Sequence, residues 1–236
     1  MVGRALARQN RCWACSSSGR ALHSHCRGKG FESPQVHKTL PVLPIYTFDH
    51  PVLRQETSQI EEDTAELQKL IKNMIATMRN ADGLGLAANQ VGKSLALTVI
   101  DLKHVEGMED RDALVLINPV LIGTEGESVF EEGCLSLPGI REEVIRPEKI
   151  GVKFLDKNLK EVEIEADKIL ARVIQHEIDH LHGKYFIDYL SPFKLSLLKG
   201  KLSKMMRGDI ETDYPLAPPS EHHAKPKGKV KRLPGM

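Results

Sequence analysis

Two histidines four residues apart, with a glutamate beside the first, carry the clearest chemical signal in this sequence. The segment reads Gln175-His176-Glu177-Ile178-Asp179-His180. Residues four apart lie on the same face of a helix, so both imidazoles can share one metal ion. Glu177 can then reach a water molecule on that metal. Taken alone, the pattern also fits an ordinary polar helix face.

A catalytic metal needs a third protein ligand and an open position, and this helix supplies only two ligands. Residues 131–138 contain Cys134, the one cysteine within the region of globular hydrophobic patterning. Glycine and proline flank it, which predicts a compact turn from which a thiolate could project. A lone cysteine is more often a small buried hydrophobic residue, so that interpretation stays open at this point.

A glycine-containing segment, residues 83–90, reads Gly-Leu-Gly-Leu-Ala-Ala-Asn-Gln. Its glycines permit close approach of a substrate backbone, and Gln90 offers an amide donor. The segment lacks the third glycine, the lysine and the preceding strand of a phosphate-binding loop. The simple alternative is a tight packing loop.

Together and in this order, the three segments resemble the peptide deformylases, whose motifs read GxGLAAxQ, EGCLS and HExDH. The resemblance covers residues 40–207. It implies a metal-dependent hydrolase that removes the formyl group from the N-terminal formyl-methionine of nascent proteins and releases formate.

The resemblance also assigns roles to single residues. It implies that Cys134, His176 and His180 bind the metal and that Glu177 is the general acid and base. It further implies that Gln90 and the Leu135 N–H form the oxyanion site, and that Arg141 is a structural arginine. In the mechanism that follows, a metal-bound hydroxide attacks the formyl carbon and Glu177 protonates the departing amine.

Selectivity for methionine calls for a narrow apolar pocket beside the metal. Ile169 and Val173 lie on the ligand face of the predicted helix, and Leu84 and Phe130 flank the other two motifs. We predict that these four side chains line the pocket and that Gly85 allows the substrate close approach.

The metal is the point on which the residues and the resemblance differ. One thiolate and two imidazoles favour zinc. The resemblance implies Fe²⁺, with Zn²⁺, Ni²⁺ or Co²⁺ as possible replacements in vitro, and we expect one Fe²⁺ per chain. Such a site should be labile in oxygen, because the Cys134 thiolate can be oxidised.

Two other functions fit parts of the pattern. An HExxH zinc endopeptidase needs a downstream ligand, but His182 falls on the wrong helical face and Asp188 follows the helix end closely. An inactive, metal-stabilised binding module near the ribosome is the other alternative. Glu177 argues against it, because a structural metal site has no use for a carboxylate there.

The elements that must position these residues can be read from hydrophobic periodicity and capping residues. We expect an α+β fold with short antiparallel β-sheets around a central metal-binding helix and a C-terminal helix. The expected helices cover residues 63–82, opened by a capping box at Asp63 and Glu66, residues 167–183 and residues 191–208. The expected strands are residues 95–102, residues 114–117 closed by Asn118-Pro119, and a hairpin over residues 150–164.

Composition sets limits on partners. The chain has 236 residues with 33 Lys and Arg against 32 Asp and Glu, a formal charge of +1. No whole-chain field therefore attracts nucleic acid or anionic lipid, and no apolar run reaches the roughly 18 residues of a membrane span. We expect nascent formylated polypeptides as substrates, transient contact with the ribosome exit region, and a monomer.

We divide the chain into three parts. Residues 1–38 are rich in arginine and have no acidic residue before Glu32, which fits an organellar transit peptide or sequence upstream of the true start. Their Cys12, Cys15, His23, His25 and Cys26 miss the usual zinc-finger spacing. Residues 39–208 form the catalytic domain, and residues 209–236 are a basic, proline-rich tail expected to be disordered. A bacterial cytoplasm is favoured; a genuine transit peptide would mean a mitochondrion or plastid.

Overall fold

Helix α2 (Lys168–Leu181) is the central element of the folded unit, and a glycine just beyond it accounts for its end. In the computed structural model, residues 40–109 and 112–220 are described. Asp167 precedes the helix in an extended conformation, and the chain leaves it at Gly183 with φ +70°. A Cβ at Gly183 would lie 2.8 Å from the carbonyl carbon of Arg54, so glycine is required there. The predicted helix over residues 167–183 is confirmed.

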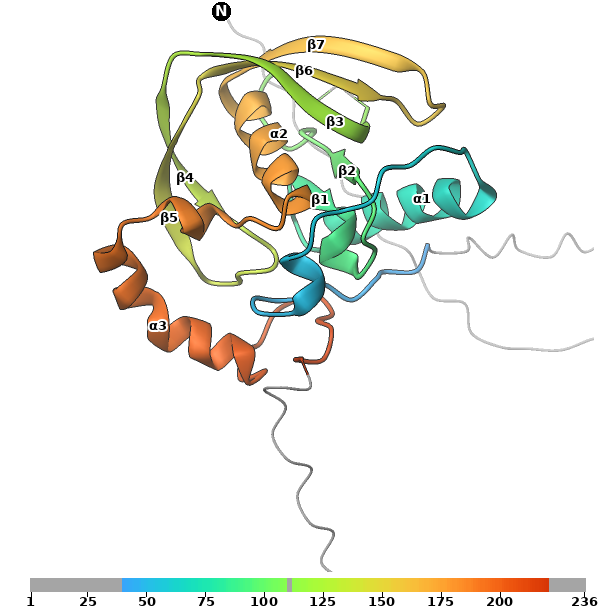
Figure 1. Ribbon diagram of the computed structural model, residues 1–236. Coiled ribbons are helices and arrows are strands. Elements are labelled where there is room, and N and C mark those ends of the chain that lie inside the picture. Colours follow the sequence, from blue (N-terminus) through green and yellow to red (C-terminus); the bar gives the residue numbers. More distant parts are fainter. Residues whose placement is uncertain (1–39, 110–111, 221–236) are drawn as a thin grey trace, which may run out of the picture. The chain divides into compact units, whose positions relative to one another are not determined.

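Two antiparallel sheets surround this helix. The larger has the strand order β1-β2-β3-β6-β7, and the smaller pairs β4 with β5. Figure 1 shows α2 running between the β4–β5 hairpin and the larger sheet. The strands are β1 (Gly85–Ala87), β2 (Leu97–Ile100), β3 (Leu114–Glu125), β4 (Ser128–Gly133), β5 (Arg141–Arg146), β6 (Lys149–Leu155) and β7 (Glu161–Asp167).

The remaining helices pack around this centre. Helix α1 (Ala65–Asn80) covers β1 and β2, and α3 (Pro192–Met206) packs against residues near β5 and the short helix η3 (Phe186–Tyr189). The 3₁₀-helices η1 (Pro51–Leu53) and η2 (Ala88–Val91) complete the unit. This confirms the α+β class. Within the described residues, no helix is both long and apolar enough to cross a bilayer.

The apolar face of α2 packs on the larger sheet. Ile174 and Ile178 are buried in a cluster with Leu116, Val152 and Phe154 of the sheet. Burying side chains of this kind contributes roughly 1.5–3 kcal/mol each. The other faces of α2 are buried as well, although they carry polar residues: Arg172, Gln175, Glu177, Asp179 and His180. Because burying such groups is costly without partners, this helix must be surrounded by hydrogen-bonding groups.

Two predicted boundaries were wrong. Helix α1 is capped by Thr64, whose Oγ1 accepts from the Leu67 N–H at 3.1 Å, and not by Asp63. Threonine one residue later is an equally good cap, and Asp63 instead accepts from the Gln68 amide. Strand β3 does not end at Asn118-Pro119 but runs to Glu125, with a register shift between Ile117 and Val120. A bulge of this kind accommodates a proline within a strand.

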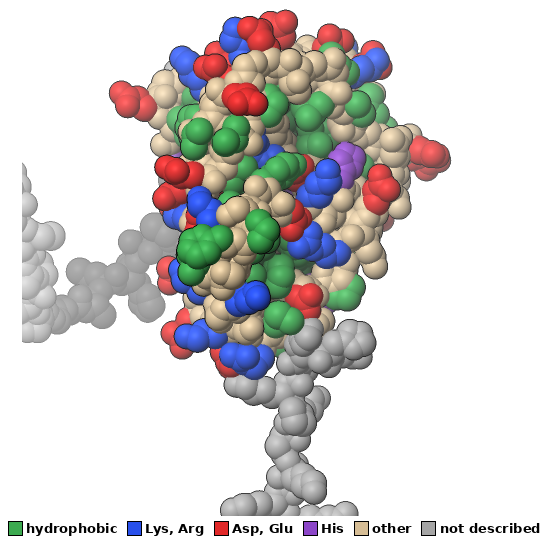
Figure 2. All heavy atoms as spheres, turned by 60° about the vertical axis from the view of Figure 1, so that its left-hand side comes forward, with side chains coloured by type: hydrophobic (Ala, Val, Ile, Leu, Met, Phe, Trp, Pro, Cys, Tyr) green, Lys and Arg blue, Asp and Glu red, His purple; other side chains and the backbone are tan. Residues whose placement is uncertain are grey.

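The β6–β7 hairpin and α3 match their predictions. Asp156 accepts from the backbone N–H groups of Asn158 and Lys160 in the turn, and Ser191 caps α3. The β4–β5 hairpin was not predicted, because its strands do not alternate cleanly between apolar and polar residues. On the face turned toward the viewer in Figure 2, acidic and basic side chains are interspersed.

The tail prediction was wrong in its first part. Residues 209–220 pack against the folded unit, where Leu216 forms a parallel bridge with Ile45 and Ala217 is buried. Exposed and covered residues alternate from Asp209 to Leu216, which is the pattern of an extended segment with one covered face. The predictions for residues 1–38 and for the basic end of the tail fall on residues 1–39 and 221–236, outside the described residues.

Candidate metal centre

Three predicted ligands come together at the middle of α2. His176 and His180 project from the helix, and Cys134 lies in the connection between β4 and β5. The Cys134 Sγ is 3.2 Å from the His180 Nε2, and one ligand atom of each of the three residues lies within 4.8 Å of the others. A thiolate and two imidazoles at this spacing fit a catalytic metal with an open coordination position.

Glu132 orients one of these imidazoles. The His176 Nδ1 lies 2.9 Å from the Glu132 Oε2, which leaves the His176 Nε2 for a metal. Glu132 is only 4% exposed. Burial opposes its ionisation, but hydrogen bonds from His176 and Arg146 outweigh burial and lower the pKa of Glu132 from 4.5 to about 2. No role was predicted for Glu132, although it stands two positions before Cys134.

Two buried arginines hold Glu132 in turn. Arg146 donates to both Glu132 oxygens, at 2.6 and 3.1 Å, and to Asp179 at 2.6 Å. Arg172 donates to Glu132 at 2.8 Å and to the carbonyls of Val144 and Ser128. Although burial disfavours its charge, the bonds to Glu132 and Asp179 raise the pKa of Arg146. The network joins α2, β4 and β5 around the ligands and fixes their relative positions.

The surroundings of the two histidines shift their pKa values in opposite directions. Burial, together with the nearby His176 and Arg146 charges, lowers the pKa of His180 well below 6.5, so His180 stays neutral. Burial also disfavours charge on His176, but its contacts with Cys134 and Glu132 raise its pKa well above 6.5. A neutral imidazole is the form that binds a metal, so metal binding at His176 must displace a proton.

Glu177 is buried beside the ligands and lacks a partner for one oxygen. Its Oε2 forms no hydrogen bond within the described part of the chain. Burial, reinforced by the Glu132 charge and opposed by His176, raises the pKa of Glu177 from 4.5 to about 7. A carboxyl group with such a pKa can both accept and donate a proton near neutral pH.

Strand β1 passes directly against Glu177. A Cβ at Gly85 would lie 2.8 Å from both Cγ and Cδ of Glu177, closer than carbon atoms approach. Gly85 is therefore required for the carboxylate to occupy its position. Gly85 was predicted to allow close approach of the substrate, and the contact that the structure shows at this glycine is with Glu177.

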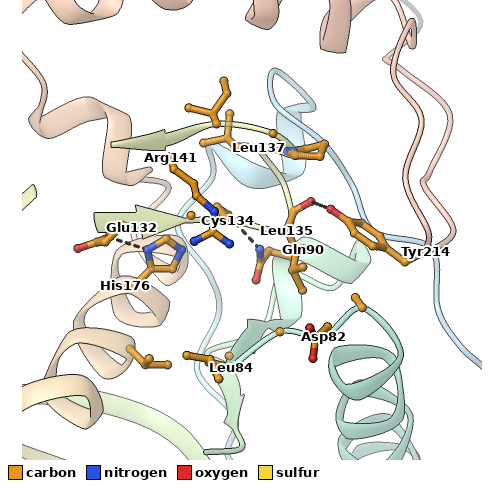
Figure 3. Close-up of a pocket in the computed structure, with 18 of the residues that line it drawn as sticks. Asp82, Leu84, Gln90, Glu132, Cys134, Leu135, Leu137, Arg141, His176 and Tyr214 are labelled. Atoms are coloured by element: carbon orange, nitrogen blue, oxygen red, sulfur yellow. Dashed lines mark hydrogen bonds and ion pairs between the residues drawn. The ribbon is translucent and has the colours of Figure 1, made fainter. Parts of the chain in front are cut away.

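Two amide groups face the same region. The Gln90 Oε1 accepts from the Ala87 N–H, which turns its Nε2 toward Ser136 Oγ at 3.1 Å and Cys134 Sγ at 3.5 Å (Figure 3). The Leu135 N–H has no hydrogen-bond acceptor among the described residues. The Leu135 N–H is thus available to an oxygen atom, whereas an oxygen bound by the Gln90 Nε2 would replace Ser136 Oγ or Cys134 Sγ as its acceptor.

A cavity of about 520 Å³ opens over this group. Leu84, Gly85, Ile169 and Val173 line it, together with Cys134, Leu135, His176 and Glu177. Phe130 does not line it. Phe130 lies two residues before Glu132 on β4, about 7 Å farther along the strand, and its ring lies beneath the Arg172 guanidinium. The prediction that Phe130 belongs to the pocket is corrected accordingly.

Arg141 also differs from its predicted structural role. Its side chain is 71% exposed, lies 3.7 Å from Glu131 and lines the cavity. An exposed ion pair of this type contributes little to stability. The buried arginines that support the site are Arg146 and Arg172, which in the described part of the chain are the ones that contact Glu132.

The alternative third ligands are not near the histidines. His182 is exposed at the end of α2, and Asp188 accepts from Arg54 and from the Tyr185 N–H. The residue that joins His176 and His180 is Cys134. This arrangement does not fit an HExxH endopeptidase that takes its third ligand downstream.

Comparison with known proteins agrees with this geometry. The family model for polypeptide deformylases matches residues 42–196, more than half of the chain. The chain belongs to the peptide deformylase family. Peptide deformylases are hydrolases that remove the N-formyl group from nascent peptides, and the Cys134–His176–His180 group is a possible site for the metal of a metalloenzyme of this family.

Individual peptide deformylases align along nearly their whole length. The enzyme of Chlorobium phaeobacteroides (strain BS1) is 45% identical over 75% of this chain and 95% of its own. That of Salinibacter ruber is 48% identical over 74% and 94%. The crystal structure of a peptide deformylase from Legionella pneumophila superimposes with a TM-score of 0.65 at 42% identity, covering 70% of this chain and 95% of that one.

Proposed function

We propose that this chain hydrolyses the formyl amide of N-formyl-methionyl peptides at a metal held by Cys134, His176 and His180. The observation that carries the proposal is the cavity that joins Cys134 and His176 to Glu177, whose Oε2 has no hydrogen-bond partner among the described residues. Two amide donors, Gln90 and the Leu135 N–H, border the same cavity. Family membership supports the same reaction.

Each residue then has one task. A metal in this site supplies Lewis-acid activation of water and of the formyl oxygen. Glu177 accepts the proton from the attacking water and returns it to the amine as the formyl C–N bond breaks, so that formate and a free amino terminus are released. Gln90 Nε2 and the Leu135 N–H hold the oxyanion that develops on the formyl oxygen.

The methionine side chain occupies the apolar part of the cavity. Leu84, Ile169 and Val173 supply its lining. Ile169 and Val173 are on the same helix as the two histidines. The methionine side chain that they contact is therefore held at a fixed distance from the formyl carbonyl. Preference for methionine follows from the fit of an unbranched thioether to this lining.

The metal that we propose is Fe²⁺, one per chain. One thiolate and two imidazoles also bind zinc, so metal analysis of the purified protein is the measurement that identifies the metal. Cys134 is partly exposed at the cavity. We therefore expect iron-loaded protein to lose activity in air as the thiolate oxidises, and zinc-loaded protein to lose it more slowly.

The substrates follow from the reaction. Nascent formylated polypeptides are the substrates, met near the ribosome exit region by a monomeric enzyme. The bacterial relatives support a bacterial cytoplasm as its location. The role of residues 1–38 as an added extension, and not part of the catalytic domain, is proposed on composition alone.

The test is anaerobic formate release from formyl-Met-Ala-Ser by Fe²⁺-loaded protein, with metal content measured on the same sample. Glu177→Gln is expected to retain the metal and lose at least 10²-fold in turnover. The control Glu165→Gln changes an exposed carboxylate on β7 and should leave turnover unchanged. Actinonin, which is bound in the crystal structure of the Ehrlichia chaffeensis peptide deformylase, is expected to inhibit.

Two results would contradict the proposal. Fully metallated protein that releases no formate is not a deformylase. Cleavage of an unformylated peptide at an internal bond would favour the endopeptidase instead.

A further inference from the structure

The segment after α3 returns to the cavity. Residues 209–217, here called the C-terminal strap, lie beyond residues 42–196 that match the family model. Four strap residues, 211–214, line the cavity opposite the α2 side. In Figure 3, Tyr214 stands at one side of the cavity with its hydroxyl directed at Leu135.

The strap is bonded to the body of the protein on both sides of Leu216. The Ile45 N–H donates to the Pro215 carbonyl at 2.9 Å, and the Ala217 N–H donates to the Ile45 carbonyl at 2.8 Å. Within the strap, the Thr212 hydroxyl donates to the Tyr214 carbonyl at 2.6 Å. These bonds fix the backbone on either side of Tyr214.

The segment that holds the strap also holds both loops with the oxyanion donors. The Tyr46 N–H donates to the Gln90 carbonyl at 2.8 Å, and the Phe48 N–H donates to the Ser136 carbonyl at 2.9 Å. Residues 45–48 therefore lie between the strap and these two loops. The strap and both loops are thus hydrogen-bonded to one short segment.

Tyr214 also reaches the second loop directly. Its hydroxyl donates to the Leu135 carbonyl at 2.9 Å. Burial raises the pKa of Tyr214 to about 12, so the phenol keeps its proton at neutral pH. The preceding peptide plane is held as well, because the Cys134 carbonyl accepts from the Leu137 N–H at 2.9 Å.

The Leu135 N–H lies in the same peptide plane as the Cys134 carbonyl, and the two backbone dihedral angles of Leu135 connect this plane to the next one, whose carbonyl Tyr214 holds. We propose that Tyr214 is a positioning residue, which aims the Leu135 N–H at the substrate oxygen from the C-terminal strap. The inference rests on the proposed function, because it assigns to that N–H the role of oxyanion donor. It makes residues 209–217 part of the catalytic architecture.

The test is Tyr214→Phe, which removes the hydroxyl and keeps the ring. We expect kcat for formyl-Met-Ala-Ser to fall about tenfold, less than the loss of a complete oxyanion donor, with KM and metal content unchanged. Thr212→Val, which removes the bond inside the strap, should lower kcat in the same direction by a smaller factor. Ser196→Ala removes a hydroxyl-to-carbonyl bond on exposed α3 and should leave kcat unchanged.

A second measurement does not depend on turnover. Amide hydrogen exchange in Zn²⁺-loaded protein should accelerate at Leu135 and Ser136 in Tyr214→Phe, and not in Ser196→Ala. Unchanged kcat and exchange in Tyr214→Phe would overturn the inference, as would a loss of kcat that only follows loss of metal. An inactive wild-type enzyme would instead refute the proposed function, and the exchange result would still decide whether Tyr214 holds the loop.

Discussion

The His176 Nδ1 and the Glu132 Oε2 are 2.9 Å apart. Glu132 stands two residues before the proposed ligand Cys134 and orients a second proposed ligand, His176, which belongs to a different element. Glu132 is itself held by Arg146 and Arg172. We therefore expect metal affinity and folding stability to depend on the same buried carboxylate.

Glu132→Gln should weaken both properties. Metal affinity is expected to fall about 10–100-fold, because His176 loses the group that sets its orientation. The free energy of unfolding should fall by about 3–5 kcal/mol, since two buried guanidinium groups lose their carboxylate. Chelator competition and denaturant unfolding measure the two effects. Glu143→Gln, exposed on β5, is the control, and equal behaviour of the two variants would contradict the role given to Glu132.

Acid should destabilise the protein through the same residue. The folded-state pKa of Glu132, about 2, lies below its ordinary value of 4.5. The contribution of Glu132 to the free energy of unfolding is thus present above pH 4.5 and is lost as pH falls toward 2. Its size is on the order of 3 kcal/mol. Unfolding free energies measured in metal-free protein between these values should decline less steeply in Glu132→Gln than in wild type.

Glu177→Gln should stabilise the metal-free protein at alkaline pH. The pKa of Glu177 in the folded protein, about 7, lies above its ordinary value of 4.5. The contribution of the neutral carboxyl group to the free energy of unfolding is therefore fully present below pH 4.5 and is lost as pH rises through 7. A neutral glutamine escapes this loss, and we expect a gain of up to about 3 kcal/mol at pH 8 and none at pH 4. Denaturant unfolding at pH 4 and pH 8 measures the gain. Equal effects of the substitution at both pH values would show that burial does not raise the pKa of Glu177.

Gly85→Ala should displace Glu177 without removing the metal. The new Cβ would meet the Glu177 side chain, and a shift of about 1 Å at a catalytic group can cost about 10²-fold in rate. We expect kcat/KM to fall by about that factor at constant metal content. Gly123→Ala adds the same methyl group in open space on β3 and provides the comparison. Full activity in Gly85→Ala would mean that Glu177 has room to move.

Val173→Trp should fill the cavity lining. Val173 is 8% exposed and faces the cavity from α2, three residues before His176. We expect KM for formyl-methionyl peptides to rise at least tenfold, while a formyl-glycyl peptide, which needs no side-chain pocket, is affected less. Val173→Ile adds less volume, and its KM should lie between those of the wild type and Val173→Trp. Unchanged turnover of the methionine substrate would remove Val173 from the pocket.

The local features of this fold could be predicted from the sequence. Helices α2 and α3 and the β6–β7 hairpin depend on caps, turns and hydrophobic periodicity that a few neighbouring residues specify. The two histidines could be named as candidate ligands for the same reason, because their motif keeps its chemistry within a short segment. Cys134 needed the resemblance, since nothing near it in the chain distinguishes a ligand from a buried thiol.

What the tertiary structure decided involves residues far apart in the chain. Glu132 becomes a buried partner of His176 only because β4 passes beside α2, and Arg141 and Phe130 are placed by how β4 and β5 project past the cavity. The same holds for the strap. Residues 209–217 contain three acidic residues and a proline and were predicted as part of a disordered tail, yet hydrogen bonds to Ile45 and Leu135 hold them in place. The composition of a segment indicates how much apolar surface it can bury. It does not show which hydrogen-bonding groups the rest of the folded chain places beside the segment.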